Sequence, residues 1–228
     1  GLEKTTLIGK NHIDFSKQFC VIARSTFGLI QQLVYFIHDK KKVYFEGGYN
    51  SYSFMNQTVY SIFYLKQKKN DKITIDEIKD FESIYDLEQF AKDTKNQDYL
   101  NVIKFINAYG DNIFEINKKI KAKLTEKKEL ADIIFTTTHK AKGLEYEQVI
   151  MADDFITKKE LINPKNKISY LKAIEELNIY YVAATRAKKA IQLADLNLSY
   201  TYNENDETTS YVKSRFINKQ ADNKKSKE

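Results

Sequence analysis

Hydrophobic residues recur along the chain in two rhythms, and their alternation predicts the order of the structural elements. Phe19 to Ala23 is a short, continuous apolar run, which is typical of a buried strand in a parallel sheet. From Thr26 to Asp39 the apolar residues lie close to helical spacing, so we expect a helix there. Val43 to Phe45 predicts a second strand, which Gly47 and Gly48 end. Strand, helix and strand in this order predict a parallel, right-handed crossover.

Residues 49–128 have a different character. Their apolar residues recur at intervals of three and four, and charged residues and asparagines fill the gaps. This spacing predicts several short helices, with Asp76 and Asp98 near the starts of two of them. We therefore expect an all-α insertion in this part of the chain.

Strand patterns return after Ala131. Ile133 to Thr137 and Gln148 to Ala152 predict two more strands, Ser169 to Arg186 predicts a long helix, and Ala190 to Ala194 predicts a last strand. Strands and helices of this kind indicate an α/β fold whose sheet is divided in sequence by the helical insertion.

The expected domain organisation follows from these patterns. Residues 1–48 and 131–200 should form the two parts of one α/β domain, and residues 49–130 the helical insertion. Residues 201–228 are polar, so few apolar groups are available to offset the entropy of ordering. We expect this last segment to be a disordered tail.

Composition narrows the class of protein only in part. The 228 residues contain 42% hydrophobic residues, enough for a core, and no apolar run long enough for a membrane span. The only cysteine, Cys20, lies in an apolar run, which predicts a buried, reduced thiol and a reducing, cytoplasmic compartment. The net charge of +6 is compatible with a nucleic-acid partner. The same excess of Lys, Asn, Ile and Tyr also arises from A+T-rich coding, so the charge is weak evidence.

Residues 136–145, Thr-Thr-Thr-His-Lys-Ala-Lys-Gly-Leu-Glu, concentrate polar groups directly after a predicted strand. In open α/β sheets, ligands bind outside the carboxyl ends of the strands. Lys142 is suited to a phosphate and Glu145 to a ribose hydroxyl, while Gly143 permits close backbone approach. Thr137 and His139 could bond a nucleic-acid phosphate. The alternative is a polar turn with a capping glutamate.

Two arginines complete the candidate chemistry. In residues 178–189 a predicted helix ends in small residues, and Arg186 follows Thr185 there. A guanidinium offers a fixed fork of donors and suits a γ-phosphate. Cationic residues at a helix carboxyl end are also favoured by the helix dipole, so this reading stays open. Arg24 follows the first strand; by itself, an arginine at that place is usually only solvated.

These segments, in this order, resemble the superfamily 1A helicases of the UvrD and Rep type. Residues 137–145 resemble motif V, 180–188 resemble motif VI, and 22–25 with the Gly-Gly element at 47–48 resemble motif IV and its sequel. The sequences of motifs V and VI are most similar to those of the F-box-type DNA helicase branch. The resemblance covers about residues 6–194 and implies the second RecA-like domain, a parallel sheet flanked by helices.

The resemblance implies residue roles. Arg24 and Arg186 would be the catalytic contacts to the γ-phosphate of ATP, Arg186 as an arginine finger. Lys142, Gly143 and Glu145 would approach the nucleotide. The residues implied to contact single-stranded DNA are Thr137, His139, Gly48 and Tyr49. We expect four charged side chains to line one cleft: Arg24, Lys142, Glu145 and Arg186. We also expect the motor to move 3′ to 5′.

The chain contains no Gly-x-x-x-x-Gly-Lys-Ser/Thr sequence. The family carries that P-loop, and the residues that hold Mg²⁺, on a preceding RecA-like domain. We therefore expect ATP and Mg²⁺ to be bound by an N-terminal domain of the same polypeptide, and these 228 residues alone to be inactive. We expect no membrane and no small-molecule substrate other than ATP.

Three other interpretations remain open at this point. The chain could be a non-enzymatic domain derived from a helicase, which binds nucleic acid or protein. It could be part of a fusion of helicase and nuclease. It could also be an α/β domain with a basic surface and no such activity, although the joint presence of the two helicase-like motifs speaks against this.

Overall fold

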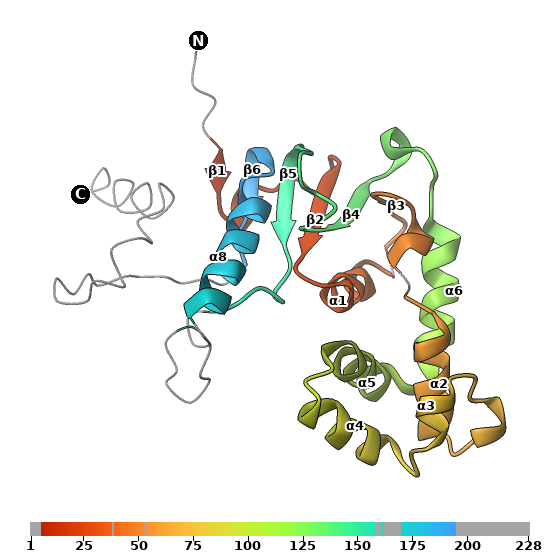
Figure 1. The fold of residues 1–228 in the computed structure, drawn as a ribbon. Helices are drawn as coiled ribbons and strands as arrows, with labels where there is room; N and C mark the ends of the chain where they lie inside the picture. The colour runs from red at the N-terminus through yellow and green to blue at the C-terminus, as the bar shows by residue number, and fades with distance from the viewer. Residues whose placement is uncertain (1–5, 38, 53, 158–160, 162–169, 195–228) are drawn as a thin grey trace.

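The computed structural model describes residues 6–37, 39–52, 54–157, 161 and 170–194. The predicted tail at 201–228 lies outside these described residues. The described strands form a parallel sheet in the order β1-β6-β5-β2-β4-β3, which can be followed across Figure 1. The strands are β1 (Leu7–Ile8), β2 (Phe19–Ala23), β3 (Val43–Phe45), β4 (Ile133–Thr137), β5 (Tyr146–Met151) and β6 (Ala187–Gln192).

Helices account for most of the remaining described chain. The α-helices are α1 (Thr26–Phe36), α2 (Gln57–Lys66), α3 (Asp76–Lys79), α4 (Ile84–Asp93), α5 (Gln97–Tyr109), α6 (Ile113–Lys123) and α8 (Tyr170–Ala184). The 3₁₀ turns are η1 (Lys10–His12), η2 (Tyr49–Tyr52), η3 (Asn70–Lys72), η4 (Gly110–Asn112) and η5 (Lys128–Leu130). The expected α/β fold with an all-α insertion is confirmed.

Several element boundaries differ from the predicted ones, as in β5, which runs from Tyr146 to Met151 rather than from Gln148 to Ala152. Strands β2, β3 and β4 have the predicted bounds. Helix α1 ends at Phe36 rather than Asp39, and β6 begins at Ala187 rather than Ala190. The first residues of β6 include exposed lysines, so an apolar run marks only the buried part of that strand. Strand β1 was not predicted, because two residues are too few to form a pattern.

Strand β2 is buried on both faces, which explains its uninterrupted apolar sequence. Phe19, Val21 and Ala23 pack in one core cluster with α1. Cys20 and Ile22 pack in a second cluster with residues of α8. Successive side chains of a strand point to opposite faces, so α1 and α8 cover opposite sides of the sheet. Cys20 is a buried free thiol, as predicted.

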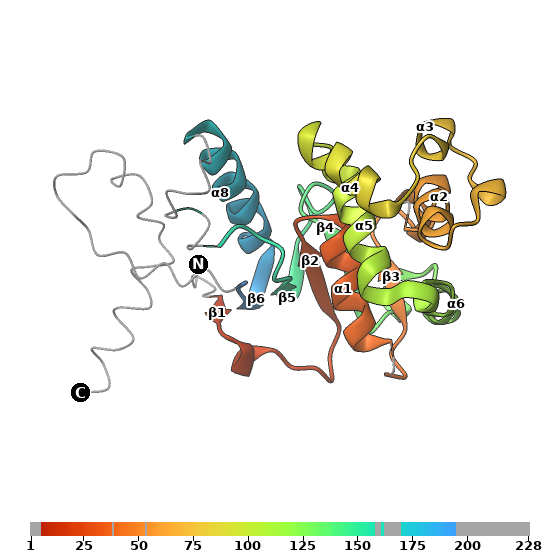
Figure 2. The same cartoon turned by 90° about the horizontal axis from the view of Figure 1, so that it is seen from below.

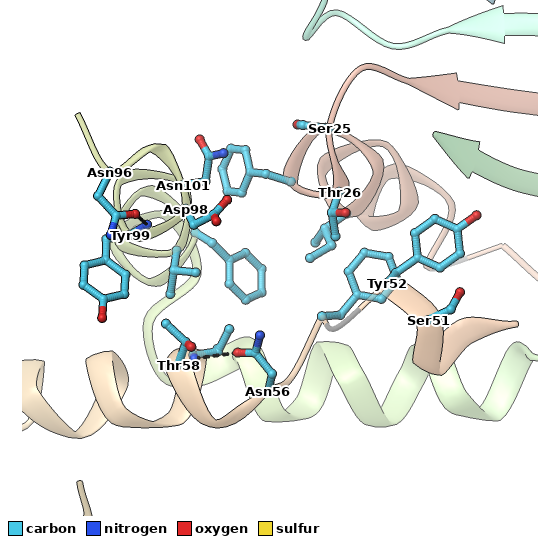
Figure 3. Close-up of a pocket in the computed structure, with 16 residues that line it drawn as sticks. Ser25, Thr26, Ser51, Tyr52, Asn56, Thr58, Asn96, Asp98, Tyr99 and Asn101 are labelled. Atoms are coloured by element: carbon cyan, nitrogen blue, oxygen red, sulfur yellow. Dashed lines mark hydrogen bonds between the residues drawn. The ribbon is translucent and has the colours of Figure 1, made fainter. Parts of the chain in front are cut away.

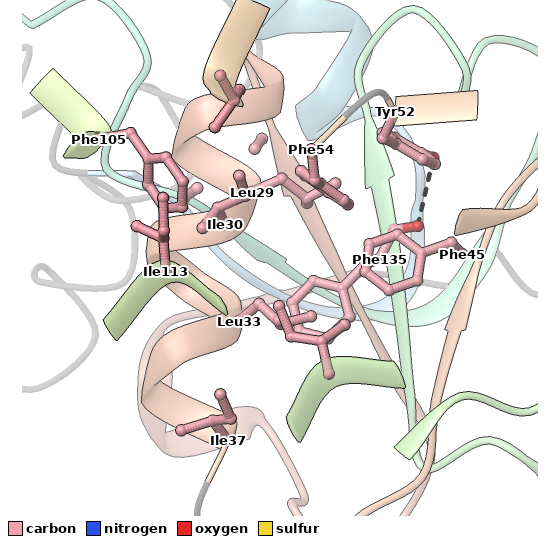
Figure 4. Close-up of a cluster of buried hydrophobic side chains, with 14 of the residues drawn as sticks. Leu29, Ile30, Leu33, Ile37, Phe45, Tyr52, Phe54, Phe105, Ile113 and Phe135 are labelled. Atoms are coloured by element: carbon pink, nitrogen blue, oxygen red, sulfur yellow. Dashed lines mark hydrogen bonds between the residues drawn. The ribbon is translucent and has the colours of Figure 1, made fainter. Parts of the chain in front are cut away.

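The helical insertion lies beside the β3 end of the sheet, whereas α8 lies at the β6 end, as Figures 1 and 2 both show. Phe105 of α5 and Ile113 of α6 belong to the same buried cluster as Leu29 and Ile30 of α1 (Figure 4). The insertion therefore shares its core with the sheet.

Because the strands are parallel, their carboxyl ends all lie along one side of the sheet, here called the carboxyl edge. Their amino ends all lie along the opposite side, the amino edge. The carboxyl edge carries Arg24 after β2, Glu46 after β3 and Thr138 after β4. The backbone amide of Thr138 donates to the carbonyl of Ala23 at 2.9 Å, which joins the ends of β4 and β2. The opposite edge carries the residues that enter the next strands, with Arg186 before β6. This division determines where the candidate site residues lie.

Candidate functional site

The segment after β4 and the end of α8 meet at the amino edge of the sheet. The Nη1 group of Arg186 donates to the carbonyl of Leu144 at 3.2 Å, and its Nε donates to the carbonyl of Val182 at 2.9 Å. The backbone carbonyl of Arg186 accepts from the amide of Tyr146 at 2.9 Å. Two segments that are distant in sequence thus form one structural unit. We call it the Arg186 corner: Lys142, Gly143, Leu144, Glu145, Arg186 and Lys188.

The Arg186 corner keeps an unneutralised guanidinium. Within the described part of the chain, no carboxylate lies within ion-pair distance of Arg186; its donors bond two carbonyls and the hydroxyl of Thr185. Lys142 is exposed. Glu145 pairs with Lys188 at 3.4 Å, and both side chains are about half exposed, so water screens this pair. The arrangement can accept a polyanion, because a fixed guanidinium with free charge binds phosphate oxygens.

The backbone conformation at position 143 of the same corner favours glycine. Its φ is +84°, a left-handed conformation that other residues adopt only with strain, and a Cβ at this position would meet no atom within 4 Å. Two hydrogen bonds close the turn around it. The amide of Ala141 donates to the carbonyl of Thr137, and the amide of Leu144 donates to the carbonyl of Ala141. These are turn bonds, so the segment is not a continuous helix.

Arg24 lies in a different, closed environment. Its Nε and Nη2 groups donate to the two carboxylate oxygens of Glu176 at 2.8 and 2.9 Å. Lys172 also pairs with Glu176, at 3.1 Å. The hydrogen bonds from Arg24 lower the pKa of Glu176, and those to Glu176 raise the pKa of Arg24.

Asp154 fixes the backbone beside Arg24. Its carboxylate accepts from the amides of Arg24 and Ser25 at 2.8 Å each, and from the Ser25 hydroxyl at 2.7 Å. Burial raises the pKa of Asp154. The side chain leaves no space at Gly28, where a Cβ would lie 2.0 Å from the Asp154 Oδ2 atom. We call Arg24, Ser25, Asp154, Lys172 and Glu176 the Arg24 cluster.

The structure does not bring all four expected charged groups to one wall. Glu145 and Arg186 lie in one corner through the contacts of Lys188 and Leu144, but Arg24 bonds Glu176, which lies ten residues before Arg186 in the chain. Ten helical residues span about 15 Å. Arg24 follows β2 whereas Arg186 precedes β6, so a parallel sheet separates them. The role of Arg24 at the γ-phosphate stays a prediction.

The location of the 136–145 segment also needs correction. The sequence argument placed this segment outside the carboxyl ends of the strands. The structure has only its first part there, because the chain then returns to the amino edge and enters β5 at Tyr146. Ala141 still bonds the Thr137 carbonyl at the end of β4, whereas Leu144 and Tyr146 bond Arg186 at the amino edge, so Lys142 lies in the turn between the two edges. Within the connection between β4 and β5, the candidate DNA contact His139 thus lies in the first half, and the candidate nucleotide contacts Lys142 and Glu145 lie in the second half.

The residues implied to contact DNA lie at the carboxyl edge. Thr137 is the buried last residue of β4, and His139 is exposed in the turn that follows. Gly48 is exposed with φ +83°. The Tyr49 ring packs on Phe45 at 5.2 Å, and its hydroxyl donates to Asn117 at 2.5 Å. Tyr49 is thus partly committed to packing.

Lys140, which the sequence reasoning passed over, joins the two parts of this surface. Its Nζ donates to the hydroxyl of Ser51 at 2.5 Å and lies 4.3 Å from the centre of the Tyr52 ring. The residue next to His139 therefore reaches the segment that follows Gly48. No sequence signal distinguished Lys140 from the neighbouring Lys142, because the contact depends on β3 lying beside β4.

Two features are absent from the described residues. No cluster of three or more His, Cys, Asp or Glu residues there has the arrangement of a metal site. Among the same residues, no helix combines the length and apolarity that a membrane span requires.

A family model and known proteins are similar to this chain. The family model of the UvrD-like helicase C-terminal domain matches residues 11–199. The chain is 28% identical over 117 residues to F-box DNA helicase 1 of Gallus gallus, covering 50% of this chain and 12% of that protein. It is 31% identical over 123 residues to F-box DNA helicase protein 1 of Schizosaccharomyces pombe, covering 52% and 14%.

The matches cover only a small part of these relatives, 12% and 14% of their lengths. No solved structure matches the chain at a significant level. The family match, in contrast, spans most of the sheet and the whole helical insertion, together with both segments of the Arg186 corner. The chain belongs to the UvrD-like helicase C-terminal domain family.

Proposed function

We propose that the chain is the C-terminal motor domain of an ATP-dependent DNA helicase that moves 3′ to 5′ along single-stranded DNA. In this proposal it works in the cytoplasm and closes onto ATP held by an N-terminal RecA-like domain of the same polypeptide. The observation that carries the proposal is the Arg186 corner. Its guanidinium is fixed by carbonyls of Val182 and Leu144 and is not neutralised by a described carboxylate.

The chemistry at the Arg186 corner is charge stabilisation. During hydrolysis, negative charge on the transferring γ-phosphoryl group is stabilised by an arginine finger, here Arg186. Lys142, exposed beside it, reaches the phosphates, and Glu145 accepts from a ribose hydroxyl after leaving Lys188. The P-loop and Mg²⁺ belong to the other domain. Arg24 could contact the γ-phosphate only after releasing Glu176.

The carboxyl edge binds the DNA strand in this proposal. His139, Gly48 and Tyr49, with Lys140 between them, face the strand, and Thr137 supports the turn from below. Contacts of this kind go mainly to phosphates, so affinity should fall steeply with salt and depend little on sequence. Both relatives are named as DNA helicases, which supports a DNA partner.

The ATP half of the proposal is tested in a protein that joins this chain to a P-loop domain. DNA-stimulated ATP hydrolysis is expected from the joined protein and not from the chain alone. The alternative, a helicase-derived domain that only binds nucleic acid or protein, predicts no stimulated hydrolysis in either. Hydrolysis by the purified chain alone would refute the division of the ATP site between two domains.

The DNA half is tested by fluorescence anisotropy of the chain with labelled single strands. Lys140→Ala should weaken binding and reduce the slope of log affinity against log salt by about 1, because one phosphate contact is lost. Lys69→Ala, which removes an exposed lysine of the insertion, is the matched control. Equal effects of both substitutions would show that binding depends on total charge and not on this surface.

A further inference from the structure

A cleft of about 570 Å³ opens between α1, η2, the start of α2 and α5 (Figure 3). It adjoins the carboxyl edge, because Ser51 and Tyr52 line it and are also the residues that Lys140 contacts. Its walls come from the sheet domain on one side and from the helical insertion on the other. The roles assigned above to individual residues leave this cleft unused.

The cleft is lined by aromatic and polar side chains, without a cation among the described residues that line it. Phe27, Phe54 and Phe105 contribute to its lining, where Phe27 is partly exposed and the other two rings are buried behind it in the core. Hydroxyl and amide groups, such as those of Thr26 and Asn101, surround this apolar surface. A cleft that combines aromatic rings with many hydrogen-bonding groups is suited to a flat organic ring with polar edges. It is poorly suited to a phosphate.

Asp98 supplies a charged acceptor on the insertion wall. It lies in the first turn of α5, is exposed, and forms neither a hydrogen bond nor an ion pair with the residues the structure describes. Figure 3 shows its side chain on the α5 side of the cleft, directed toward α1 and Thr26. By contrast, Asn56 and Asn96 have their carbonyl oxygens engaged by the amides of Val59 and Tyr99.

We propose that this cleft receives one base of the bound single strand and that Asp98 favours bases with an exocyclic amino group, cytosine over thymine. The inference rests on the proposed binding of single-stranded DNA and extends it to base preference. The backbone stays at the edge of the cleft, where Lys140 and His139 meet its phosphates.

The physical basis is the complementarity of the base edge. Stacking on an aromatic side chain holds any base in a single-strand site, and Phe27 and Tyr99 are the partly exposed rings of the lining. A carboxylate accepts a hydrogen bond from the N4 amino group of cytosine. Thymine has a carbonyl oxygen at that place, which a carboxylate repels. The same negative charge, without a cation in the lining, keeps the phosphates outside.

The test compares labelled oligo-dC and oligo-dT of equal length by fluorescence anisotropy with the intact chain at slightly alkaline pH. We expect oligo-dC to bind about five-fold or more tightly, the lower end of the discrimination that a good base contact gives. Asp98→Asn and Asp98→Ala should bring this ratio close to one. Asp76→Asn removes an equal charge from the first turn of α3 and should leave the ratio unchanged.

The ratio of affinities separates the inference from general electrostatics, because a lost negative charge strengthens binding of both oligonucleotides alike. Equal affinity for oligo-dC and oligo-dT in the unchanged protein, or a ratio that persists in Asp98→Ala, overturns the base-reading role. The proposed DNA function survives either result if Lys140→Ala still weakens binding. Failure of both oligonucleotides to bind overturns the proposed DNA function itself.

Discussion

The Arg24 cluster and the Arg186 corner each contain an arginine near α8, but the two guanidinium groups have different hydrogen-bond acceptors. Arg24 donates to both oxygens of Glu176, so its charge is neutralised by a carboxylate. Arg186 donates to the carbonyls of Val182 and Leu144, which orient the guanidinium without cancelling its charge. In sequence, Arg24 follows a strand and Arg186 follows a helix, and neither context indicates whether a carboxylate pairs with the arginine.

The difference bears on which arginine is ready to act on a phosphate. An arginine held by carbonyls keeps its positive charge for an incoming anion, whereas one paired with a carboxylate must first break that pair. The comparison therefore favours Arg186 as the finger and gives Arg24 a structural role that links β2 to α8. Four predictions test this contrast, beginning with the largest expected effect, a loss of turnover, and ending with the smallest, a change in stability.

The largest effect is expected for Arg186→Ala in a protein that joins this chain to a P-loop domain. Turnover of ATP should fall by roughly 10³–10⁵, as for other arginine fingers, with only a small loss of ATP affinity. Arg24→Ala should reduce turnover far less. Steady-state hydrolysis with saturating single-stranded DNA measures both. Equal losses would mean that Arg24 releases Glu176 when ATP binds, and the contrast would be wrong.

Gly28→Ala is expected to disturb the Arg24 cluster by crowding. The new Cβ would lie 2.0 Å from the Asp154 Oδ2 atom, so the carboxylate must leave the amides of Arg24 and Ser25. Overpacking of this kind lowers the free energy of unfolding by about 1–3 kcal/mol. Denaturant unfolding measures the loss. In an Asp154→Ala background the same substitution should be nearly neutral, and additive losses would refute the conflict.

Glu176→Gln is expected to lower the free energy of unfolding by roughly 1.5–3 kcal/mol at neutral pH, because two hydrogen bonds to a charged partner are weakened. The pKa of folded Glu176 is lowered, so its contribution exists above the unfolded-state pKa and disappears as pH falls through the folded value. The difference between variant and parent should therefore shrink in acid. Because burial raises the pKa of Asp154, that group changes stability in the opposite direction.

A difference that stays constant down to acidic pH would contradict the role of the Glu176 charge. Denaturant unfolding of parent and variant, measured at several pH values, gives this comparison directly. Asp154 is unchanged in both proteins, so its contribution largely cancels in the difference.

The smallest effect is expected for Lys188→Ala in the Arg186 corner. The side chains of Lys188 and Glu145 are 49% and 60% exposed, so their ion pair should contribute less than about 0.5 kcal/mol to stability. Thermal unfolding of the variant should match the parent. A clear loss would show that the Arg186 corner, like the Arg24 cluster, depends on side-chain charge pairs for its structure.

The sequence predicted the buried elements better than the exposed ones. Strand β2 and strand β4 were found at their full lengths, because every residue in them is buried. Strand β6 was found only in part, because Lys188 and Lys189 are exposed at its start. The pattern of apolar residues shows which residues are buried. It predicts secondary structure only where the whole element is buried or buried on one regular face.

The candidate site was predicted unevenly for a related reason. Sequence identified Arg186 and the turn around Gly143 as polar segments near helix and strand ends. It placed Arg24 at the end of the first strand but could not find its partner Glu176, since that contact depends on α8 covering β2. Lys140 and Asp98 were missed as candidate contacts, because their neighbours come from other elements, η2 and α1.

By itself, the sequence determined the α/β class, the helical insertion and the segments that carry the helicase family's motifs, because these depend on local periodicity and residue identity. The tertiary structure decided which charges are paired and which remain free. It joined Leu144 to Arg186 and Arg24 to Glu176, and it formed the cleft between α1 and α5. Such contacts depend on strand order and packing across more than forty residues of chain, as for Leu144 and Arg186 at a separation of 42, and no local pattern encodes them.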